Sequence, residues 1–448
     1  MNSSRGSDRY RPLFHFTSAK GWLNDPNGMV FYKGEYHLFF QLNPSGTEWG
    51  NMTWGQAIST DLVHWKQLPN AIEIDSFGHV FSGTAVVDWK NTSGFRTGAE
   101  DVIVAFYTAE GQMLNPKKPT TQCIAFSNDR GRTFVKYSGN PIIDQITVGN
   151  RDPKVFWHEP SKRWIMVLYV EEKRDENKVH TFKFFNSTDL KKWEQTGSID
   201  GFYECPEFFE LPKEGNEKDK KWVLLAADSG YLIGTFDGKS FTPESSKMLL
   251  DHGRSFYAAQ TFNDIPASDG RRIIIGWMRG GKYPDMPFSQ QMGFPSELTL
   301  GKRHGQICLI RKPVMEIELL RKESLFNDGF ILKSGTNPFN GIIGDAFELK
   351  LKTVCSGSQG VSIGFHGQEL VYQPANGTLS VCGNSVSVGK CNQLDIAVLI
   401  DRTSVEIFAD DGAISMSECF IPDGSGKISL EPLQGDLTVS DCNLFRVG

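Results

Sequence analysis

An acidic turn followed by an aromatic residue recurs four times in the first 241 residues, and it constrains the fold more than any other feature. The copies are STDLVHW (59–65), SNDRGRTF (127–134), STDLKKW (187–193) and a weaker TFDGKSF (235–241). Repeats of this length, each with room for about four strands, are typical of propeller blades. About 300 residues at roughly 60 per repeat predict five blades. The alternative is an ordinary β-turn that recurs in a β-rich chain.

The segments between these turns have the character of strands. They are short, rich in β-branched and aromatic residues, and bounded by Gly, Pro, Asn or Asp. An aromatic content of 12% with 45 glycines fits many strands and tight turns better than helices. We therefore predict an all-β protein with strands in YHLFFQL (36–42), DVIVAFYT (101–108), WIMVLYV (164–170), WVLLAA (222–227) and RIIIGWM (272–278).

The character of the chain changes after about residue 303. The stretch 304–325 is charged, contains Pro313 and has one plausible short helical segment. Alternating segments separated by Gly, Asn and Asp turns follow, namely FELKLKTV (347–354), LDIAVLIDRTSVEIFA (394–409) and KISLEPL (427–433). This pattern predicts a β-sandwich of about 120 residues. We expect a five-bladed β-propeller over 1–303, a linker over 304–325 and a β-sandwich over 326–448.

Charge and hydropathy argue against two classes of partner. The chain has 47 Lys and Arg against 53 Asp and Glu, a net charge of −6, and no long basic run. Binding to nucleic acid without sequence preference requires such basic residues to neutralise phosphates, so we expect no nucleic-acid partner. The longest apolar runs, such as 164–170, are far shorter than the ~20 residues that span a bilayer, so we expect no membrane partner.

The compartment is less constrained. The first residues, MNSSRGSDRYR, are polar and lack the apolar core of a signal peptide, as in a cytoplasmic protein or a processed secreted one. N-x-S/T sequons occur at Asn2, Asn51, Asn91, Asn186 and Asn376. We favour secretion, with the cytoplasm as the alternative.

None of the eight cysteines forms a CxxC motif, which disfavours a structural zinc site. Cys382 and Cys391 could form a hairpin disulfide, or all eight could be reduced.

Three acidic residues lie in loops rich in aromatic residues, Gly or Pro. Asp25 lies in WLNDPNG (22–28), Asp152 in RDP (151–153) and Glu204 in YECPEFFEL (203–211). Any one of them alone is best interpreted as an acidic residue that stabilises a turn or caps a helix. All three, however, fall at comparable places relative to the repeat, and in a propeller such positions can converge at the central channel.

Paired carboxylates in an aromatic pocket are what glycoside hydrolysis requires. One carboxylate attacks the sugar or activates water, and the other protonates the leaving oxygen. Trp and Phe faces suit the apolar faces of sugars, and Asn, Gln and Arg suit the hydroxyl groups. The residues alone therefore point to a sugar as substrate.

A series of motifs resembles glycoside hydrolase family 32, the family of invertases, inulinases and fructan exohydrolases. The motifs are WLNDPNG, FFQLNP (39–44), WGNMTWGQA (49–57), FSGT (81–84), RDP, ECPE (204–207), FYAAQTF (256–262), IGWM (275–278), PSELTL (295–300) and DRTSVEIFADDG (401–412). Their order and approximate spacing agree with the family over essentially the whole chain. Two positions depart from it: Gln56 stands where His is frequent and Thr84 where Ser is common. We expect these departures to alter the pH response or subsite detail rather than to abolish activity.

The resemblance implies a retaining β-fructofuranosidase that needs neither metal nor cofactor. Asp25 would be the nucleophile, Glu204 the general acid and base, and Asp152 would stabilise the transition state while binding ring hydroxyls. In a retaining enzyme the carboxyls of Asp25 and Glu204 should lie about 5–5.5 Å apart. The substrate would be bound by Trp22, Asn24, Gln41, Trp49, Phe81, Ser82, Arg151, Tyr257 and Trp277.

Several alternatives stay open on sequence grounds. The substrate could be sucrose and short fructooligosaccharides, or the fructan polymers inulin and levan, and a fructosyltransferase would use the same intermediate. Inverting propeller glycosidases also use three acids but separate their carboxyls by about 6.5–9.5 Å. A sugar-binding module without catalysis is the remaining reading, and the chain could be a monomer or a homodimer.

Overall fold

The computed structural model describes residues 8–355, 360–389 and 393–448 and is built almost entirely of β-strands. Its helical elements in this part of the chain are three short 3-10 helices, η1 (Gly111–Met113), η2 (Met315–Leu320) and η3 (Asp410–Gly412). None of the helices in these residues has the length and apolar character needed to cross a membrane. The predicted all-β class is confirmed.

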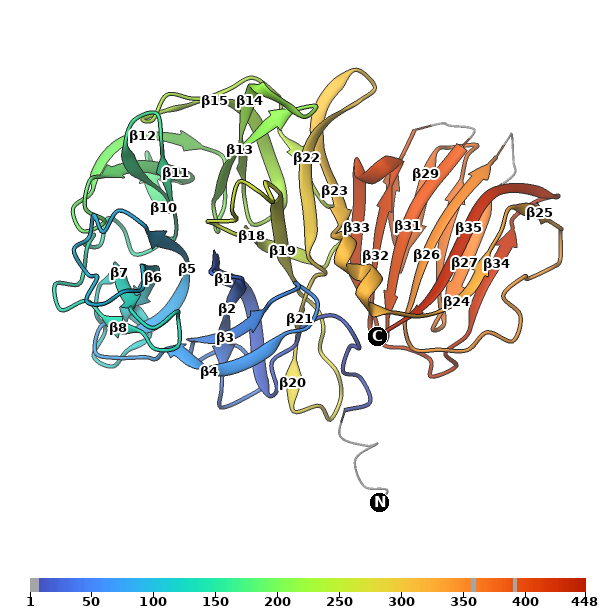
Figure 1. Ribbon diagram of the computed structural model, residues 1–448, viewed down its shortest axis with the longest axis horizontal. Coiled ribbons are helices and arrows are strands. Elements are labelled where there is room, and N and C mark those ends of the chain that lie inside the picture. Colours follow the sequence, from blue (N-terminus) through green and yellow to red (C-terminus); the bar gives the residue numbers. More distant parts are fainter. Residues whose placement is uncertain (1–7, 356–359, 390–392) are drawn as a thin grey trace. The chain divides into compact units, whose positions relative to one another are not determined.

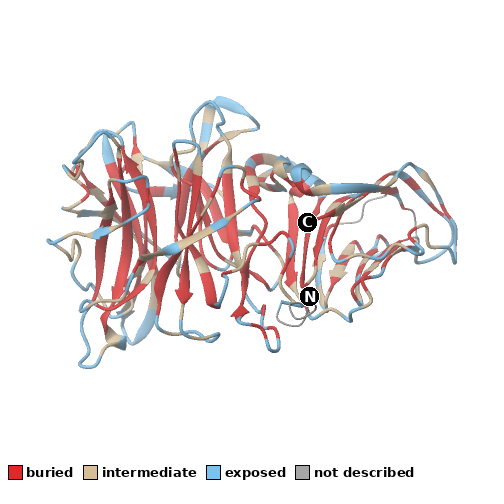
Figure 2. Cartoon of the chain, turned by 60° about the horizontal axis from the view of Figure 1, so that its bottom comes forward, coloured by how far each residue is buried: buried red, intermediate tan, exposed pale blue. Residues whose placement is uncertain are grey.

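The chain divides into two compact units. The site unit comprises Ser18–Leu249 and Tyr257–Trp277. The C-terminal unit comprises Met1–Thr17, Leu250–Phe256 and Met278–Gly448. In both units buried residues follow the strands, whereas exposed residues concentrate in the loops (Figure 2).

The site unit contains four successive groups of four antiparallel strands, each in simple up-and-down order (Figure 1). The first is β1 (Gly21–Tyr32), β2 (Glu35–Asn43), β3 (Thr53–Ser59) and β4 (Lys66–Ile72). The second is β5 (His79–Asp88), β6 (Val102–Glu110), β7 (Thr120–Ser127) and β8 (Val135–Lys136). The third is β9 (Arg151–His158), β10 (Arg163–Arg174), β11 (Asn177–Ser187) and β12 (Glu194–Asp200). The fourth is β13 (Glu207–Lys213), β14 (Asn216–Leu225), β15 (Gly230–Phe236) and β16 (Phe241–Pro243), with β17 (Met248–Leu249) also paired to β15.

Two further strands, β18 (Phe256–Thr261) and β19 (Arg272–Met278), pair with each other after the fourth group. The strands predicted over 36–42, 101–108, 164–170 and 272–278 correspond to β2, β6, β10 and β19. The stretch 222–227 overlaps the end of β14, which stops at Leu225.

The recurring acidic turn occupies the same place in all four groups, between the third and the fourth strand. In each copy the Oδ1 atom of the aspartate accepts hydrogen bonds of 2.7–3.1 Å from two backbone N–H groups just after it. The aspartates are Asp61, Asp129, Asp189 and Asp237. A side-chain carboxylate that accepts from its own following backbone stabilises a tight turn, which explains why the motif recurs where a strand reverses.

The C-terminal unit holds two larger antiparallel sheets. One contains β24 (Arg321–Asn327), β25 (Phe330–Leu332), β26 (Phe347–Val354), β31 (Gln393–Asp401), β32 (Ser404–Ala409), β33 (Ile414–Cys419) and β35 (Leu437–Val447). The other contains β27 (Val361–Phe365), β28 (Gln368–Gln373), β29 (Thr378–Val381), β30 (Asn384–Ser387) and β34 (Ile428–Pro432). Alternate residues of β26, Phe347, Leu349 and Leu351, join side chains such as Ile363 and Leu370 of the other sheet in one hydrophobic cluster.

The stretch predicted as a linker, 304–325, is largely structured. It contains β23 (Gln306–Pro313), which forms a hairpin with β22 (Ser296–Arg303), followed by η2 and the start of β24. The short strands β20 (Phe288–Ser289) and β21 (Gln291–Met292) precede this hairpin. The short helical segment expected here is η2, whereas the domain boundary at 303 stays a prediction. The possible Cys382–Cys391 disulfide and the sequon at Asn2 involve residues outside the described part of the chain.

A buried network of charged side chains crosses the C-terminal unit. Arg311 donates from Nη1 to Asp251 at 2.6 Å and from Nη2 to Glu406 at 2.5 Å. The ring nitrogens of His15 lie 2.9 Å from Asp401 and 2.9 Å from Glu406. Burial alone would lower the pKa of His15, but hydrogen bonds and charge from the two carboxylates raise it to about 9. The imidazole is therefore held as a cation.

Candidate active site

The sequence-predicted site residues meet at one cavity of about 190 Å³ in the site unit. Its lining residues are Asn24, Asp25, Gln41, Trp49, Phe81, Ser82, Arg151, Asp152, Glu204, Tyr257 and Trp277. Trp22, also predicted, lies next to this set: its Nε1 donates to Asn24 Oδ1 at 2.7 Å, and its ring meets that of Trp277 edge to face at 6.2 Å. Every predicted site residue is thus at or beside this cavity.

Two of the acids lie in the first part of the first strand of their group, and the third lies just before such a strand. Asp25 lies near the beginning of β1, Asp152 near the beginning of β9, and Glu204 just before β13. The register of β1 shifts between Leu23 and Pro26, which places Asp25 in an irregular part of the strand. Asp152 and Glu204 have φ values of 64° and 52°, in the left-handed region that side chains other than glycine rarely adopt. Such conformations cluster at functional sites, because the surrounding structure must hold them in place.

Asp25 is fixed through both carboxylate oxygens. Ser82 Oγ donates to Oδ2 at 2.6 Å, and Asn24 Nδ2 donates to Oδ1 at 3.0 Å. Burial raises the pKa of Asp25, the two hydrogen bonds oppose this rise, and the charge of Glu204 adds to it. The two donors orient the carboxylate and also favour its charged form.

Asp152 is buried, with only 6% of its surface exposed. Its backbone N–H donates to Thr108 Oγ1 at 3.0 Å, and its Oδ2 accepts from the backbone N–H of Cys205 at 3.1 Å. Burial raises the pKa of Asp152 to about 7, with Arg151 opposing the rise and the charges of Glu204 and Asp25 adding to it. The site thus disfavours the charged form of the Asp152 carboxyl group.

Glu204 is held by a cation on one side and a phenol on the other. Its Oε1 accepts from Arg151, including an Nε contact of 3.2 Å, and its Oε2 accepts from Tyr257 OH at 3.0 Å. Arg151 is itself positioned by the ring of Tyr169, 4.6 Å from its guanidinium carbon, and by the Gly149 carbonyl, to which its Nη1 donates at 3.1 Å. The carboxylate of Glu204 is therefore oriented toward the cavity by groups on two different strands.

Cys205 connects the acids. Its Sγ lies 3.6 Å from Asp25 Oδ2 and 3.6 Å from Asp152 Oδ2, and burial raises the pKa of its thiol well above the ordinary value. The group is therefore a neutral thiol that can donate weakly to either carboxylate. A small uncharged side chain at this position lets the two acids approach one another.

Aromatic rings surround the acids. Trp49 meets Phe81 at 5.9 Å, and Tyr257 meets Trp277 at 6.0 Å, both edge to face. Trp49 is 51% exposed, as expected of a ring at a cavity mouth. The Nε1 atom of Trp277 is buried and finds no hydrogen-bond acceptor within the described residues. A buried donor without a partner at the wall of a cavity is a natural contact for a ligand oxygen.

Sequence reasoning missed the residues that support the acids from behind. Thr108 ends the run DVIVAFYT and Tyr169 lies within WIMVLYV, where both read as strand residues. Their roles depend on contacts between separate strands, which a single sequence does not reveal. The two departures from the family pattern are also placed. Gln56 is buried and donates from Nε2 to the Gly131 carbonyl at 2.6 Å, and Thr84 Oγ1 donates to the Pro153 carbonyl at 3.0 Å. Neither is among the residues that line the cavity.

No group of three or more His, Cys, Asp or Glu side chains in residues 8–355, 360–389 and 393–448 is arranged to hold a metal ion. The arrangement of the acids suits acid–base and nucleophilic chemistry on a neutral polar ligand.

Comparisons with known proteins cover nearly the whole chain. The model of the glycosyl hydrolases family 32 N-terminal domain matches residues 15–313, and that of the family 32 C-terminal domain matches residues 316–445. A levanase from Bacillus subtilis (strain 168) is 37% identical over 478 residues, covering 95% of this chain and 68% of the levanase. An extracellular exo-inulinase from Aspergillus niger is 30% identical over 491 residues, covering 92% of this chain and 90% of that protein.

Solved structures of similar enzymes superpose on nearly the whole chain. An exo-inulinase from Aspergillus awamori superposes with a TM-score of 0.86 at 28% identity, covering 98% of both chains. A β-fructofuranosidase from Schwanniomyces occidentalis, complexed with fructosyl-erythritol, superposes with a TM-score of 0.85 at 26% identity, also covering 98% of both chains.

Proposed function

Because the chain belongs to glycosyl hydrolase family 32 and is a glycoside hydrolase, we propose that it is a retaining β-fructofuranosidase. It removes terminal, non-reducing β-D-fructofuranosyl units from sucrose and short fructooligosaccharides. The observation that carries this proposal is the meeting of Asp25, Asp152 and Glu204 at one cavity lined by aromatic rings.

Asp25 acts as the nucleophile. With Ser82 and Asn24 fixing its two oxygens, the carboxylate attacks the anomeric carbon of the fructosyl unit, and the bond to the leaving oxygen breaks. The product of this step is a covalent fructosyl-enzyme. Water then attacks the same carbon from the opposite side, so the configuration is retained overall.

Glu204 supplies and recovers the proton. It protonates the leaving oxygen in the first step and removes a proton from the attacking water in the second. Asp152 and Arg151, adjacent on β9, bind the ring hydroxyls, and the carboxylate of Asp152 stabilises the positive charge that develops on the sugar. The buried Nε1 of Trp277 provides a further donor to the substrate.

A fructan exohydrolase is the second candidate, and the relatives favour it. The named relatives are a levanase and exo-inulinases, at 37% and 30% identity. Initial rates on sucrose, 1-kestose, inulin and levan separate the two: higher kcat/KM on the polymers than on sucrose would make the chain a fructan exohydrolase. Accumulation of longer oligosaccharides at high sucrose would instead identify a fructosyltransferase.

The decisive test of the proposal is the Asp25→Ala variant. It should lose sucrose cleavage almost entirely, whereas the exposed Asp144→Ala control of the same unit should keep it. NMR of the first product from the wild-type protein should show the β-anomer of fructose. Near-wild-type turnover by Asp25→Ala would refute the nucleophile, and initial release of the α-anomer would indicate an inverting enzyme. Binding of fructans without release of reducing sugar would indicate a module that has lost catalysis.

We also propose the finer architecture, the location and the assembly. Four repeated groups of four strands support a five-bladed propeller over 1–303, and the shared core of two sheets supports a β-sandwich over 326–448, joined through 304–325. Relatives named extracellular favour secretion over the cytoplasm. The partner is a small sugar, and sedimentation would decide between monomer and homodimer.

A further inference from the structure

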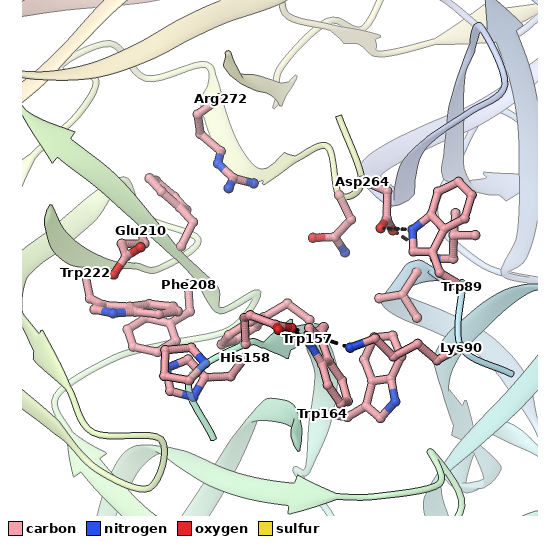
Figure 3. Close-up of a pocket in the computed structure, with 17 residues that line it drawn as sticks. Trp89, Lys90, Trp157, His158, Trp164, Phe208, Glu210, Trp222, Asp264 and Arg272 are labelled. Atoms are coloured by element: carbon pink, nitrogen blue, oxygen red, sulfur yellow. Dashed lines mark hydrogen bonds and ion pairs between the residues drawn. The ribbon is translucent and has the colours of Figure 1, made fainter. Parts of the chain in front are cut away.

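A second and larger cavity, of about 410 Å³, lies in the site unit and shares no lining residue with the one that holds the acids (Figure 3). Four tryptophans line it, together with several charged side chains. The tryptophans are Trp89, Trp157, Trp164 and Trp222, and the charged side chains include Asp264 and Arg272. A volume of this size falls within the range of small-molecule sites, about 300–1,000 Å³.

The two cavities lie at opposite ends of the same strands. On β9, Asp152 lines the first cavity and Trp157 the second, five residues further along. At about 3.3 Å per residue this corresponds to roughly 16 Å. Between these ends, Lys154 and Glu207 are each 1% exposed and form an ion pair of 2.8 Å. The second cavity is thus a separate site rather than an extension of the first.

Three of the four indole rings of this cavity are held in place by hydrogen bonds from their own nitrogens. Trp89 Nε1 donates to Asp264 Oδ1 at 2.8 Å, and Trp164 Nε1 donates to Thr92 Oγ1 at 2.8 Å. Trp157 Nε1 donates to Glu159, and its ring meets that of Trp164 at 5.2 Å. Rings that are fixed before a ligand arrives lose little entropy on binding, which favours affinity.

Polar groups face the same space. Among the described residues, the only hydrogen bond from the Arg272 side chain runs from Nη1 to the Phe262 carbonyl, at 3.2 Å. Figure 3 shows Arg272 and Asp264 on the side of the cavity opposite Trp157 and Trp164. Two cations, Lys90 and Arg272, stand against three carboxylates of the lining, Glu159, Glu210 and Asp264. This near balance suits a neutral ligand rich in hydroxyl groups better than a strongly charged one.

We propose that this cavity is a second carbohydrate-binding site, which takes one or two rings of a neutral fructan oligosaccharide. The exposed ring of Trp89 and the partly exposed ring of Trp157 contact the apolar faces of the sugar rings, and Arg272 with the carboxylates binds the hydroxyls. The choice of a fructan as ligand rests on the proposed function, whereas the existence of a sugar site does not.

The test uses the full chain carrying Asp25→Ala, so that hydrolysis does not consume the ligand, and titrates it with nystose by calorimetry. Two binding sites are expected. Trp89, 49% exposed, and Trp49, 51% exposed, make a matched pair of variants, one at each cavity. Adding Trp89→Ala should weaken one site at least ten-fold and leave the other unchanged, and adding Trp49→Ala should weaken only the other site.

A single nystose site in the parent, or two sites that both Trp89→Ala and Trp157→Ala leave unchanged, would overturn the proposal. The second variant keeps the test decisive if the first one fails to fold. A wild-type protein that does not hydrolyse sucrose would refute the proposed function but would leave the two-site binding result unaffected. Conversely, a single site in a chain that hydrolyses sucrose would refute only the second site.

Discussion

Replacing Asp152 with Asn should stabilise the protein while removing its activity. Burial, together with the charges of Glu204 and Asp25, raises the pKa of Asp152 from 3.8 to about 7 against the opposing effect of Arg151. At about 1.4 kcal/mol per pKa unit, a rise of roughly three units means that ionising this group costs the folded state at most about 4 kcal/mol. Asn keeps an oxygen that can accept from Cys205 N–H but loses the attraction to Arg151, so we expect a net gain of about 1–2 kcal/mol.

The gain should depend on pH in a definite direction. Between about pH 4 and pH 7 the folded protein keeps a proton on Asp152 that the unfolded chain has released, so this group lowers the stability of the wild type as the pH rises. The Asn variant has no carboxyl group to ionise at this position, so it does not lose this stability as the pH rises. The difference in Tm between variant and wild type should be near zero at pH 4 and reach roughly 1–4 °C above pH 7.

Thermal unfolding followed by circular dichroism at pH 4, 6 and 8, with sucrose hydrolysis measured in parallel, tests this expectation. Asp61→Asn is the matched control. Partial burial works against the charged form of Asp61, but hydrogen bonds from His64 and Val63 hold its pKa below the ordinary value. Asp61→Asn should therefore lower Tm at neutral pH. An Asp152→Asn variant that is less stable than wild type at pH 8, or a gain that is equal at pH 4 and pH 8, would refute the reasoning.

Three further outcomes are expected. Glu204→Gln should slow sucrose hydrolysis by about 10²–10⁴-fold, and bond cleavage in an aryl fructofuranoside, whose leaving group departs without a proton, should slow less in pre-steady-state assays. Ser82→Ala removes a hydrogen bond that lowers the pKa of Asp25, so the acidic limb of the kcat/KM profile should move to higher pH; an unmoved limb would argue against Asp25 as the ionised nucleophile. His15, with its pKa raised to about 9, contributes stability that is fully present below pH 6.5 and lost as the pH rises through 9. The Tm advantage of wild type over His15→Gln should therefore shrink between pH 7 and pH 10, as scanning fluorimetry would show.

Local chemistry made much of the fold predictable. The acidic turn could be recognised because a carboxylate that accepts from the backbone after it needs only neighbouring residues. The prediction was weaker where the chain folds against distant partners. Residues 306–313 looked like a charged linker but form β23, because pairing with β22 satisfies their backbone groups. The stretch 394–409 looked continuous but contains two strands, because the chain turns at Arg402 and Thr403. No Gly or Asn marks this turn in the sequence, so it was not predicted.

The residues of the site could be predicted only in part. The acids and the rings around them could be named from motifs and their resemblance to a family, and the structure brings them to one cavity. Thr108 and Tyr169 could not be named, because each acts on the site only through a neighbour on another strand. Gln56 illustrates the opposite case. It stands out in the sequence, yet its amide is directed to the Gly131 carbonyl rather than to the cavity, so any effect on pH response must pass through packing.

The acids occupy positions that the fold stabilises poorly. Asp152, Glu204 and Cys205 all have positive φ values, and the burial that raises the pKa of Asp152 and Asp25 disfavours the charges that catalysis requires. Both costs arise from gathering negative groups at the beginnings of several strands, where they can reach one substrate. The same strands end at the tryptophan-lined cavity, whose rings are already hydrogen-bonded and whose charges nearly balance. Substitutions at the catalytic end should therefore exchange activity for stability, whereas Trp89→Ala at the other end should change binding with little effect on Tm.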